Sequence, residues 1–485
     1  MIPLSLAQIA TITGATLDQV PDPGVVTCGP VVIDSRRATP GALFAALPGE
    51  RADGHGFAPA ALRAGAVAVL AARPAGIPAL IVPDVPAALA RLAHENAERL
   101  RGLTIAGITG SAGKTTTKDL TAQLAERLGP TVAPEGSFNN ELGHPLTVLR
   151  AGERTRYLIL ELSARGRGHI SKLCGIAPPR LGAVLNVGRA HVGEFGGLDA
   201  VARAKAELPG ALPAGGVAVL NADDPRVAAM AARTAARVVT FGRSDGAVVR
   251  AADVAVDGAG RPAFTLVTPE GAAPVRLNLR GAHNVANALG SAVLARELGM
   301  PVDAIADGLS AAVARSKWRM EATERPDGVT VINDAYNASP EAMAAALTSL
   351  RVMMGGGRSS HGRERALRRR GLAVLGHMVD LGEASVAAHE EVGRLAARAG
   401  VTALVVVGDE AAPILAGAKA EPGWRGRLLQ VPDRQAAAAA VSALLAPGDI
   451  VLVKASRAAG LEQVALALLG EPQARQVRRT SEVTP

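Results

Sequence analysis

The stretch of sequence that decides the fold is Gly107-Ile-Thr-Gly-Ser-Ala-Gly-Lys-Thr-Thr-Thr117. An apolar run at Leu103–Thr109 predicts a buried strand at its start, and Lys114 opens a predicted helix that continues through Leu120 and Leu124. A glycine-rich turn between a strand and a helix directs backbone N–H groups and the positive end of the helix toward an anion. The stretch therefore predicts an α/β unit that binds the phosphates of ATP or GTP.

Each position of this turn has an expected role. Lys114 would reach the β- and γ-phosphates, and the Thr115 hydroxyl would bind Mg²⁺. The usual spacing G-x-x-x-x-G-K-[ST] is not met, because Ile108 stands where the first glycine is expected and Gly107 lies one position earlier. The alternative is a strand–helix turn that binds no ligand. The expected ATP-binding positions of the turn are Gly110, Ser111, Ala112, Gly113, Lys114, Thr115 and Thr116.

The whole chain divides into three predicted units, residues 1–101, 102–313 and 314–485. Short apolar runs alternate with helical segments such as Ala87–Arg101, which favours a mostly parallel sheet in each unit. The runs that predict strands are Val31–Asp34, Phe44–Ala46, Ala66–Leu70, Leu80–Pro83, Leu103–Thr109, Leu158–Glu161, Ala183–Val187, Val217–Asn221, Thr330–Asn333, Leu372–Leu375, Ala403–Val407 and Ile450–Val453.

Composition excludes several classes of protein. Of the 485 residues, 48% are hydrophobic and 20% are charged, which excludes global disorder. No apolar run approaches the roughly 18 to 20 residues that cross a bilayer, and no basic, apolar leader opens the chain. Only Cys28 and Cys174 are present, so neither a disulfide framework nor a cysteine-based metal cluster is available. We expect a cytoplasmic protein with no stable membrane insertion.

The net charge of +8 and the pI near 10 could indicate a nucleic-acid-binding protein. The positive charge is concentrated, however. Arg358–Arg370 carries +5 and residues 475–485 carry +2, which leaves +1 for the remainder. Six Phe, two Trp and two Tyr leave few rings to stack on bases. We therefore expect no nucleic-acid partner, and we interpret Gly355–Gly371 as a mobile surface loop without a catalytic role.

Further motifs follow one another along the chain. They are Asp34-Ser-Arg36, Gly136-Ser-Phe-Asn-Asn-Glu-Leu-Gly143, Asn186-Val-Gly-Arg-Ala-His-Val-Gly193, Ala204-Lys-Ala-Glu207, Asn221-Ala-Asp-Asp-Pro225, Gly281-Ala-His-Asn-Val-Ala-Asn287, Asp334-Ala-Tyr-Asn-Ala-Ser-Pro340 and Val453-Lys-Ala-Ser-Arg457. With the variant phosphate loop they resemble the Mur ligases, the ATP-dependent enzymes that build the peptide stem of peptidoglycan. The similarity runs from about residue 30 to about residue 465. It implies a central P-loop-type domain with a mostly parallel sheet, an N-terminal UDP-binding α/β domain and a C-terminal Rossmann-like α/β domain.

The resemblance also implies a reaction. The chain would be an amide ligase that adds D-Ala-D-Ala to UDP-N-acetylmuramoyl-tripeptide, using ATP and Mg²⁺. The tripeptide carboxylate would attack the γ-phosphate, and the amine of D-Ala-D-Ala would displace phosphate from the acyl phosphate. Because phosphoryl transfer leaves little covalent work to a protein, positioning and charge neutralisation dominate. We expect a monomer with these two substrates as partners.

Metal-binding and catalytic residues come from the same resemblance. Glu161, His191 and Lys205 would hold Mg²⁺ together with Thr115. Lys205 matches a lysine that is carbamylated in related enzymes, whereas the alternative is a solvated helix lysine paired with Glu207. Only seven of the 52 basic residues are lysines, which fits a position that needs a primary amine. The implied catalytic residues are Lys114, His191 and Lys205.

The remaining implied contacts are to the nucleotide and the substrates. Asn287 would contact the base, Asp334 the nucleotide and Arg319 its phosphates. The segment Asp53-Gly-His-Gly-Phe57 resembles a UDP-binding segment, and Arg36 suits a diphosphate. The expected substrate-binding residues are Ser35, Arg36, Asn139, Asn140, Tyr336, Asn337, Lys454, Ser456 and Arg457.

Some positions depart from the family pattern. His377 stands where an acidic residue is usual, Ala455 replaces a glycine, and Ser137-Phe138 and Asn333 are atypical. Two other ligases remain as alternatives: a sibling that adds a diamino acid to the UDP-MurNAc-dipeptide, and a folylpolyglutamate synthetase. The sibling typically carries an Asp-Asn-Pro-Arg-like segment that this sequence lacks, and Tyr336-Asn-Ala-Ser-Pro340 favours the dipeptide-adding enzyme. The UDP-type first unit disfavours the folyl enzyme.

Overall fold

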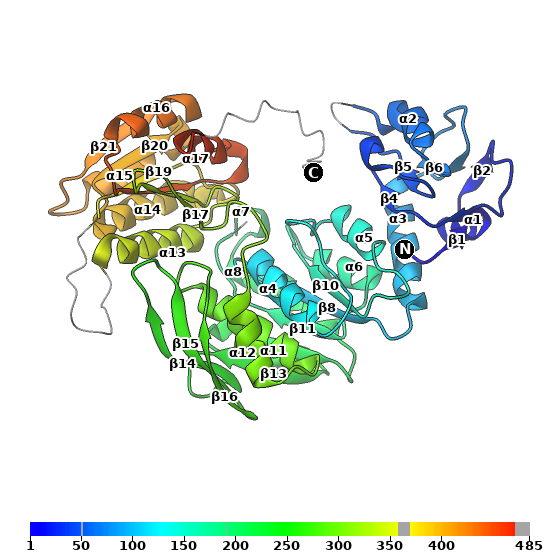
Figure 1. Ribbon diagram of the computed structural model, residues 1–485, viewed down its shortest axis with the longest axis horizontal. Helices are drawn as coiled ribbons and strands as arrows, with labels where there is room; N and C mark the ends of the chain where they lie inside the picture. The colour runs from blue at the N-terminus through cyan, green and yellow to red at the C-terminus, as the bar shows by residue number, and fades with distance from the viewer. Residues whose placement is uncertain (50–51, 191, 357–368, 471–485) are drawn as a thin grey trace.

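The computed structural model describes residues 1–49, 52–190, 192–356 and 369–470. Over these residues the chain forms three mixed sheets with helices packed on them, and one separate two-stranded pairing (Figure 1). In Figure 1 the first unit lies at the upper right, the third at the upper left, and the central unit below them. Of the helices that the structure describes, none is long and apolar enough to cross a membrane.

A five-stranded sheet forms the core of the first unit. Its elements are β1 (Leu4–Ser5), α1 (Leu6–Thr13), β2 (Thr16–Asp18), β3 (Val26–Thr27), β4 (Val31–Val32), β5 (Leu43–Ala45), α2 (Ala58–Arg63), β6 (Ala68–Ala71), β7 (Ala79–Ile81) and α3 (Val85–Arg99). The order β2-β7-β6-β5-β4 is parallel except for β2 at one edge. The Asp84 side chain starts α3 by accepting a hydrogen bond from Ala87 N at 2.9 Å. Leu89 and Leu92 of α3 then pack against this sheet.

A nine-stranded sheet forms the central unit, in the order β16-β15-β14-β13-β12-β11-β8-β10-β9. The strands are β8 (Thr104–Thr109), β9 (Thr131–Val132), β10 (Tyr157–Glu161), β11 (Leu181–Val184), β12 (Val217–Asn221), β13 (Arg237–Gly242), β14 (Val249–Val256), β15 (Pro262–Thr268) and β16 (Gly271–Arg276). In the order of the sheet, the seven neighbouring strands β9, β10, β8, β11, β12, β13 and β14 are parallel, as predicted. Because β8 lies between β10 and β11, its carboxyl end opens beside both of theirs, where α/β sheets bind ligands.

Helices cover both faces of the central sheet. They include α4 (Lys114–Glu126), α5 (Gly143–Val148), α6 (His169–Ile176), α7 (Val192–Phe195), α8 (Leu198–Lys205), α11 (Asn284–Glu297) and α12 (Val302–Ala311). On one face α4, α11 and α12 bury one apolar cluster. On the other face α5 and α6 share a cluster with α3, which joins the first unit to the central one.

The antiparallel extension made by β15 (Pro262–Thr268) and β16 (Gly271–Arg276) is absent from the strands that the sequence predicts. These strands continue the sheet beyond β14 and pair antiparallel with one another. Their buried residues alternate along the chain, with Phe264 and Leu266 on β15 and Ala273 and Val275 on β16. That alternation, after the turn at Asp257-Gly-Ala-Gly260, was the available signal.

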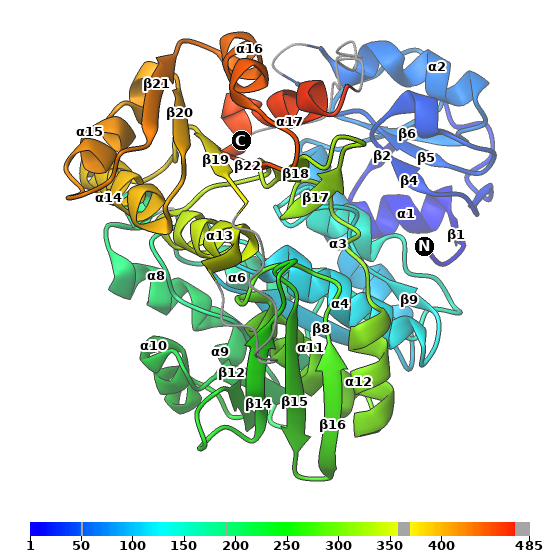
Figure 2. The same cartoon turned by 60° about the vertical axis from the view of Figure 1, so that its left-hand side comes forward.

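The third unit has helices on both faces of a six-stranded sheet ordered β17-β18-β22-β19-β20-β21. Its elements are β17 (Glu321–Glu324), β18 (Thr330–Asn333), α13 (Pro340–Arg351), β19 (Gly371–Leu375), α14 (Ser385–Ala399), β20 (Ala403–Val407), α15 (Pro413–Lys419), β21 (Arg427–Val431), α16 (Arg434–Leu444), β22 (Ile450–Lys454) and α17 (Glu462–Leu468). All strands but β17 are parallel. Figure 2 shows the strands between α13 and α14 on one side and α16 and α17 on the other. This is the Rossmann-like layering that the family resemblance implies.

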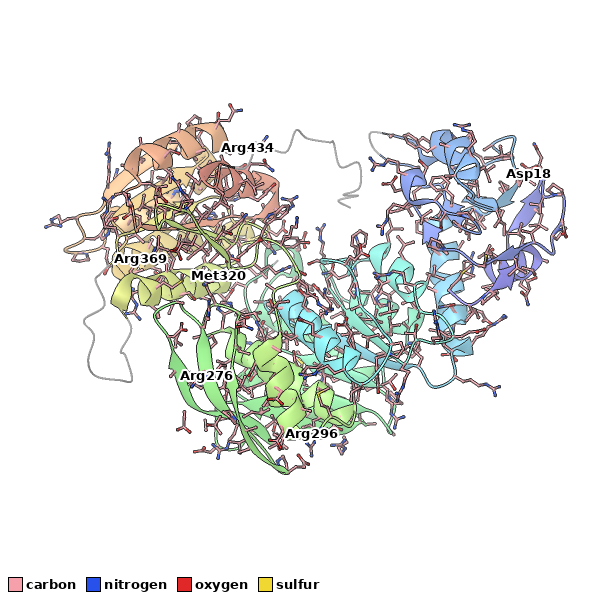
Figure 3. All side chains as sticks on the ribbon, in the orientation of Figure 1. Asp18, Arg276, Arg296, Met320, Arg369 and Arg434 are labelled. Atoms are coloured by element: carbon pink, nitrogen blue, oxygen red, sulfur yellow. The ribbon has the colours of Figure 1, made fainter. Side chains whose placement is uncertain are left out.

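The prediction that Gly355–Gly371 forms a loop is partly wrong. Residues 357–368 lie outside the described residues, but the Arg369 side chain is fixed in the third unit (Figure 3) and Gly371 begins β19. The guanidinium of Arg369 donates hydrogen bonds of 2.6 to 3.2 Å to four oxygens. The acceptors are the carbonyls of Gly328, Gly448 and Asp449 and the hydroxyl of Thr330. Arg369 therefore joins the turns that precede β18 and β22.

Candidate active site

The predicted phosphate loop, residues 110–113, links β8 to α4 and is fixed by the segment that follows β11. Asn186 Oδ1 accepts a hydrogen bond from Ala112 N at 2.8 Å, and Asn186 Nδ2 donates to Ala112 O at 3.0 Å. Gly188 N donates to the Ser111 hydroxyl at 2.8 Å, and this hydroxyl donates to Gly188 O at 3.1 Å. The predicted strand Ala183–Val187 therefore ends early, at Val184, because its last residues hold the loop.

Gly113 is required both by its backbone and by its neighbour. Its φ of +83° lies in the left-handed region that favours glycine. A Cβ atom here would lie 2.1 Å from Asn287 Oδ1 of α11. Asn287 is buried, and Asn284 orients it, because Asn287 Nδ2 donates a 2.8 Å hydrogen bond to Asn284 Oδ1. The structure thus brings Asn287 against the phosphate loop, and its contact with a base stays a prediction.

Lys114 is the first residue of α4, as predicted. Its Nζ donates a 2.7 Å hydrogen bond back across the loop to Gly110 O. Burial lowers the pKa of Lys114, the Glu161 carboxylate opposes that shift, and the Arg319 guanidinium adds to it. The ammonium is therefore held over the loop, where it can exchange the carbonyl for a phosphate oxygen.

Two segments far apart in the sequence meet at Thr115. The Ser137 hydroxyl lies 3.0 Å from Thr115 Oγ1. Arg319 Nη2 of the third unit donates to both hydroxyls, at 2.7 Å to Thr115 and 3.0 Å to Ser137. The Arg319 guanidinium also lies 4.3 Å from the centroid of the Tyr336 ring, which is a cation–π contact. The structure thus brings Arg319 and Tyr336 to the phosphate loop.

Glu161 ends β10 beside the loop and fits a divalent cation. Its Oε1 accepts a 2.6 Å hydrogen bond from Asn139 Nδ2, whereas its buried Oε2 has no hydrogen-bond partner among the described residues. A buried carboxylate oxygen is costly unless it is paired, and a metal ion would pair it. The described part of the chain holds no group of three His, Cys, Asp or Glu side chains placed to bind a metal ion, but Mg²⁺ commonly takes one or two carboxylates with phosphate oxygens and waters. His191 lies outside the described residues.

Lys205, the last residue of α8, is only 5% exposed. Burial lowers its pKa well below the ordinary lysine value, and the nearby Lys114 ammonium lowers it further. The partner considered from sequence, Glu207, is engaged elsewhere, because its carboxylate accepts hydrogen bonds from Gly168 N at 2.6 Å and Ser171 N at 3.0 Å. The alternative of a solvated lysine paired with Glu207 is therefore wrong.

Asp334 and Lys454 form a buried ion pair that supports Arg319 from within the third unit. Lys454 Nζ lies 2.7 Å from Asp334 Oδ2 and donates to Asn337 O at 2.8 Å. Asp334 Oδ1 accepts from Met320 N at 3.0 Å, immediately after Arg319; Figure 3 shows Met320 in the third unit on the side of the central unit. Lys454 is thus turned inward, and the substrate contacts of Lys454 and Asn337 stay predictions.

Ser456 and Arg457, which follow β22, are also engaged within the protein. The buried Ser456 hydroxyl accepts a 3.1 Å hydrogen bond from Val379 N. Arg457 forms a 2.8 Å ion pair with Glu462, and its guanidinium lies 4.2 Å from the centroid of the Trp318 ring. Arg457 therefore packs against Trp318, whereas Ser456 binds the backbone of Val379.

Ser35 and Arg36 lie in the first unit, in the short 3₁₀ turn after β4. The Arg36 guanidinium makes a two-point pair with Asp34, through Nε to Oδ1 at 2.9 Å and Nη2 to Oδ2 at 2.7 Å. The side chain is 61% exposed, so it remains accessible to a ligand. Among the described residues no hydrogen bond or ion pair connects Ser35 or Arg36 to the phosphate loop. The structure does not bring the predicted UDP and ATP residues together.

His55 and Asn140 have local partners. Buried His55 has its Nδ1 2.6 Å from Asp53 Oδ1, and its Nε2 accepts from Ala72 N at 3.1 Å. Asn140 Oδ1 accepts from Gly143 N at 2.8 Å at the start of α5. Both ring nitrogens of His55 are thus occupied, so it serves the fold of the first unit.

The structure adds three residues to the site whose roles the sequence does not indicate: Ser137, Asn186 and Glu341. Ser137 departs from the family pattern, and Asn186 begins a motif at a strand end. Glu341, in the first turn of α13, accepts a 3.0 Å hydrogen bond from Arg189 N. This contact joins the third unit to the segment that follows β11, in which Asn186 holds the phosphate loop. Nothing in the sequence indicates that contact.

The chain matches three family descriptions in succession. They are "Mur ligase family, catalytic domain" at residues 30–105, "Mur ligase middle domain" at 108–295 and "Mur ligase, glutamate ligase domain" at 318–457. The site is that of a nucleotide-binding α/β enzyme, and the family matches make it a ligase that uses ATP to form an amide bond. The chain belongs to the Mur ligase family.

Full-length relatives narrow this class. The chain is 48% identical to the UDP-N-acetylmuramoyl-tripeptide–D-alanyl-D-alanine ligase of Mycobacterium tuberculosis H37Rv, over 99% of this chain and 100% of that protein. The crystal structure of MurF from Acinetobacter baumannii matches with a TM-score of 0.84 at 30% identity, over 96% of this chain and 99% of that one. The MurF ligase of Thermotoga maritima in complex with ADP matches with a TM-score of 0.75 at 30% identity, over 91% and 97%.

Proposed function

We propose that this ligase adds D-alanyl-D-alanine to UDP-N-acetylmuramoyl-tripeptide in the synthesis of the peptidoglycan precursor. The observation that carries the proposal is the contact of Arg319 with Thr115, because it joins the loop that would hold ATP to the unit that would hold the second substrate. The 48% identical relative, which aligns from end to end, supports the choice of substrates.

Two anions meet in the first step. A carboxylate oxygen of the tripeptide forms a bond to the γ-phosphorus, the bond from that phosphorus to the β–γ bridging oxygen breaks, and ADP departs. Lys114 and Arg319 both lie at the loop that would hold the phosphates, so they neutralise charge without moving far. The neutral amine of D-Ala-D-Ala then attacks the acyl carbon, phosphate leaves with the bonding electrons, and the nitrogen releases one proton.

We infer that Thr115 and Glu161 hold Mg²⁺, with His191 as a further predicted ligand. The inference is supported by Glu161 Oε2, which has no hydrogen-bond partner within the part of the chain that the structure describes. When bound, the ion neutralises charge on the phosphate oxygens and orients them. Glu161 is itself oriented by Asn139, which would also place Asn139 beside the acyl end of the tripeptide.

Lys205 is proposed to act as a carbamate. A buried amine with a lowered pKa has an unprotonated form, whose nitrogen lone pair attacks the carbon of CO₂ and releases one proton. The product is an anion beside Lys114, where the free ammonium would be a second cation. The carbamate thus converts a repulsion into an attraction in the buried site.

The substrates are assigned to the outer units. We propose residues 1–101 as the UDP domain, with Arg36 exchanging Asp34 for the diphosphate next to Ser35. Residues 102–313 form the ATP domain, and residues 314–485 the D-Ala-D-Ala domain, with Tyr336 and Asn337 near the dipeptide. We expect a cytoplasmic monomer that binds no nucleic acid.

ADP release tests the proposal. One reaction contains ATP, UDP-MurNAc-tripeptide and D-Ala-D-Ala, and the other contains ATP, UDP-MurNAc-dipeptide and a diamino acid. We expect turnover with the first set only. Turnover with the second set alone would assign the chain to the sibling ligase, and inactivity with both would contradict the proposal.

A further inference from the structure

We propose that two adjacent residues of α4, Lys118 and Asp119, are positioning residues for the site. They anchor the two segments whose tips, Ser137 and Arg319, meet at Thr115. The activity readout of this inference rests on the proposed function, whereas its structural readout does not. Neither residue is part of the phosphate loop, and neither contacts Thr115 in the hydrogen bonds described above.

Lys118 and Asp119 form an ion pair one turn after the phosphate loop. Their side chains are 2% and 9% exposed. Removing two charges from water is so costly that apolar residues of similar volume usually stabilise a fold at least as well. A buried pair at this position therefore needs an explanation other than stability.

Lys118 anchors the first segment. Its Nζ donates a 2.8 Å hydrogen bond to Pro134 O, just after β9. Ser137 follows Pro134 by three residues, and its hydroxyl returns to α4 at Thr115. Both the base and the tip of this segment are thus attached to the same helix, one turn apart.

Asp119 anchors the second segment in the same way. Its Oδ2 accepts a 3.1 Å hydrogen bond from Ser316 N, and Arg319 follows Ser316 by three residues. Gln123, one turn further along α4, extends this anchor, because its side-chain amide both donates to Val313 O and accepts from Val313 N at 3.0 Å. The connection between the central and third units is therefore fixed along one face of α4.

The spacing explains why the anchors matter. Three residues span at most about 10 Å, so fixing the base of a segment restricts where its tip can lie. A misplacement of about 1 Å in a positioning group can lower a rate roughly 10²-fold. The pair Lys118–Asp119 thus restricts Ser137 and Arg319 to the surroundings of Thr115, through opposite members of one ion pair.

Two double variants separate positioning from stability. Lys118→Met with Asp119→Leu removes both charges together, so no unpaired charge stays buried and the fold should persist. Lys118→Met with Asp119→Asn also removes both charges but keeps an acceptor for Ser316 N. We expect the Met/Leu variant to lower kcat roughly 10²-fold, with the KM for ATP within about threefold of wild type, and the Met/Asn variant to recover part of that loss. A Met/Leu variant with wild-type kcat would overturn the proposal.

Trp318 supplies a readout that needs no substrate. The chain has two tryptophans, so a Trp424→Phe background leaves Trp318, two residues after Ser316, as the sole tryptophan. In that background we expect the Met/Leu variant to lower Trp318 anisotropy and to raise its acrylamide quenching about twofold or more over the Met/Asn variant. Equal values in both variants would overturn the role of Asp119, even if the Met/Leu variant were less stable.

The control is Glu95→Gln, which breaks the exposed Glu95–Arg99 pair of α3 and should change neither kcat nor Trp318. An inactive wild type with the expected Trp318 response would count against the proposed function alone.

Discussion

The Arg319 guanidinium donates a 2.7 Å hydrogen bond to the Thr115 hydroxyl across 204 positions of sequence. Thr115 lies in the first turn of α4, directly after the phosphate loop, and Arg319 lies at the start of the third unit. Arg319 is also held by the Ser137 hydroxyl and by the Tyr336 ring. The hydroxyl expected to bind Mg²⁺ thus accepts a hydrogen bond from a cationic group that lies where it could neutralise phosphate charge.

Replacing Arg319 tests this arrangement. We expect Arg319→Ala to lower kcat by about 10²- to 10³-fold, because a cation aimed at the transferring phosphoryl group is lost. The affinity for ADP should stay within a few-fold, since the loop backbone and Lys114 remain. Arg319→Lys should recover only part of the rate, because a point charge cannot bond both hydroxyls as the guanidinium does. Arg315→Ala, which removes a partly exposed pair with Glu126, is the control; equal losses in both variants would contradict a specific role.

Substitutions of Lys205 should affect turnover far more than nucleotide binding. Lys205→Ala should bind ADP almost normally but turn over at least about 100-fold more slowly, since the carbamate stabilises charge in the chemical step. Acetate or formate should restore part of the rate by occupying the vacated anionic position. Lys205→Arg should stay inactive, because guanidinium forms no such carbamate. A fully active Arg variant would rule out the carbamate.

His144 makes stability depend on pH. It is buried in α5, and burial lowers its pKa to about 4, whereas an unfolded histidine titrates near 6.5. The folded state therefore keeps His144 neutral while the unfolded state takes up a proton as pH falls below about 6.5. This contribution to the free energy of unfolding is complete above about pH 6.5 and falls by up to about 3 kcal/mol as pH drops toward 4.

Urea unfolding at several pH values measures that contribution. His144→Leu should flatten the pH dependence between pH 6.5 and 4, whatever its own effect on stability at pH 7.5. His94→Gln, at an exposed position of α3, should leave the dependence unchanged. An unaltered slope in the Leu variant would show that the acid sensitivity arises elsewhere.

Residues 358–367 and the neighbouring Arg369 should differ in their effects on activity and stability. Deleting residues 358–367 should leave kcat within a few-fold, since none of these residues belongs to the proposed site. Arg369→Ala should instead lower the free energy of unfolding by about 2–4 kcal/mol, because four acceptors lose a charged donor. Chemical denaturation and steady-state turnover of the two variants test both statements. A loss of turnover in the deletion with an unchanged melting temperature would reveal a catalytic role.

Local sequence signals predicted the parallel sheets well. The run Leu103–Thr109, the glycine-rich turn and the helix from Lys114 each depend on neighbouring residues, so the phosphate loop could be predicted without tertiary information. The strands β15 and β16 were missed because alternation in short segments is a weak signal beside the βα pattern around them.

Tertiary contacts explain what sequence could not predict in the site. No local pattern indicates that Ser137 and Arg319 converge on Thr115, because the chain returns to α4 only through the anchors at Pro134 and Ser316. The type of a residue also does not indicate the direction in which its side chain lies. The sequence does not indicate that Lys454 Nζ lies 2.7 Å from Asp334 Oδ2, and the contact of Lys454 with a substrate stays a prediction.

Isotope transfer tests the central claim most directly. UDP-MurNAc-tripeptide carrying ¹⁸O in both oxygens of its terminal carboxylate is incubated with enzyme, Mg²⁺, ATP and D-Ala-D-Ala, and the released phosphate is analysed by mass spectrometry. If the carboxylate attacks the γ-phosphate, one ¹⁸O must appear in each phosphate and one must remain in the new amide. Phosphate without ¹⁸O, alongside formation of the amide product, would contradict activation through an acyl phosphate.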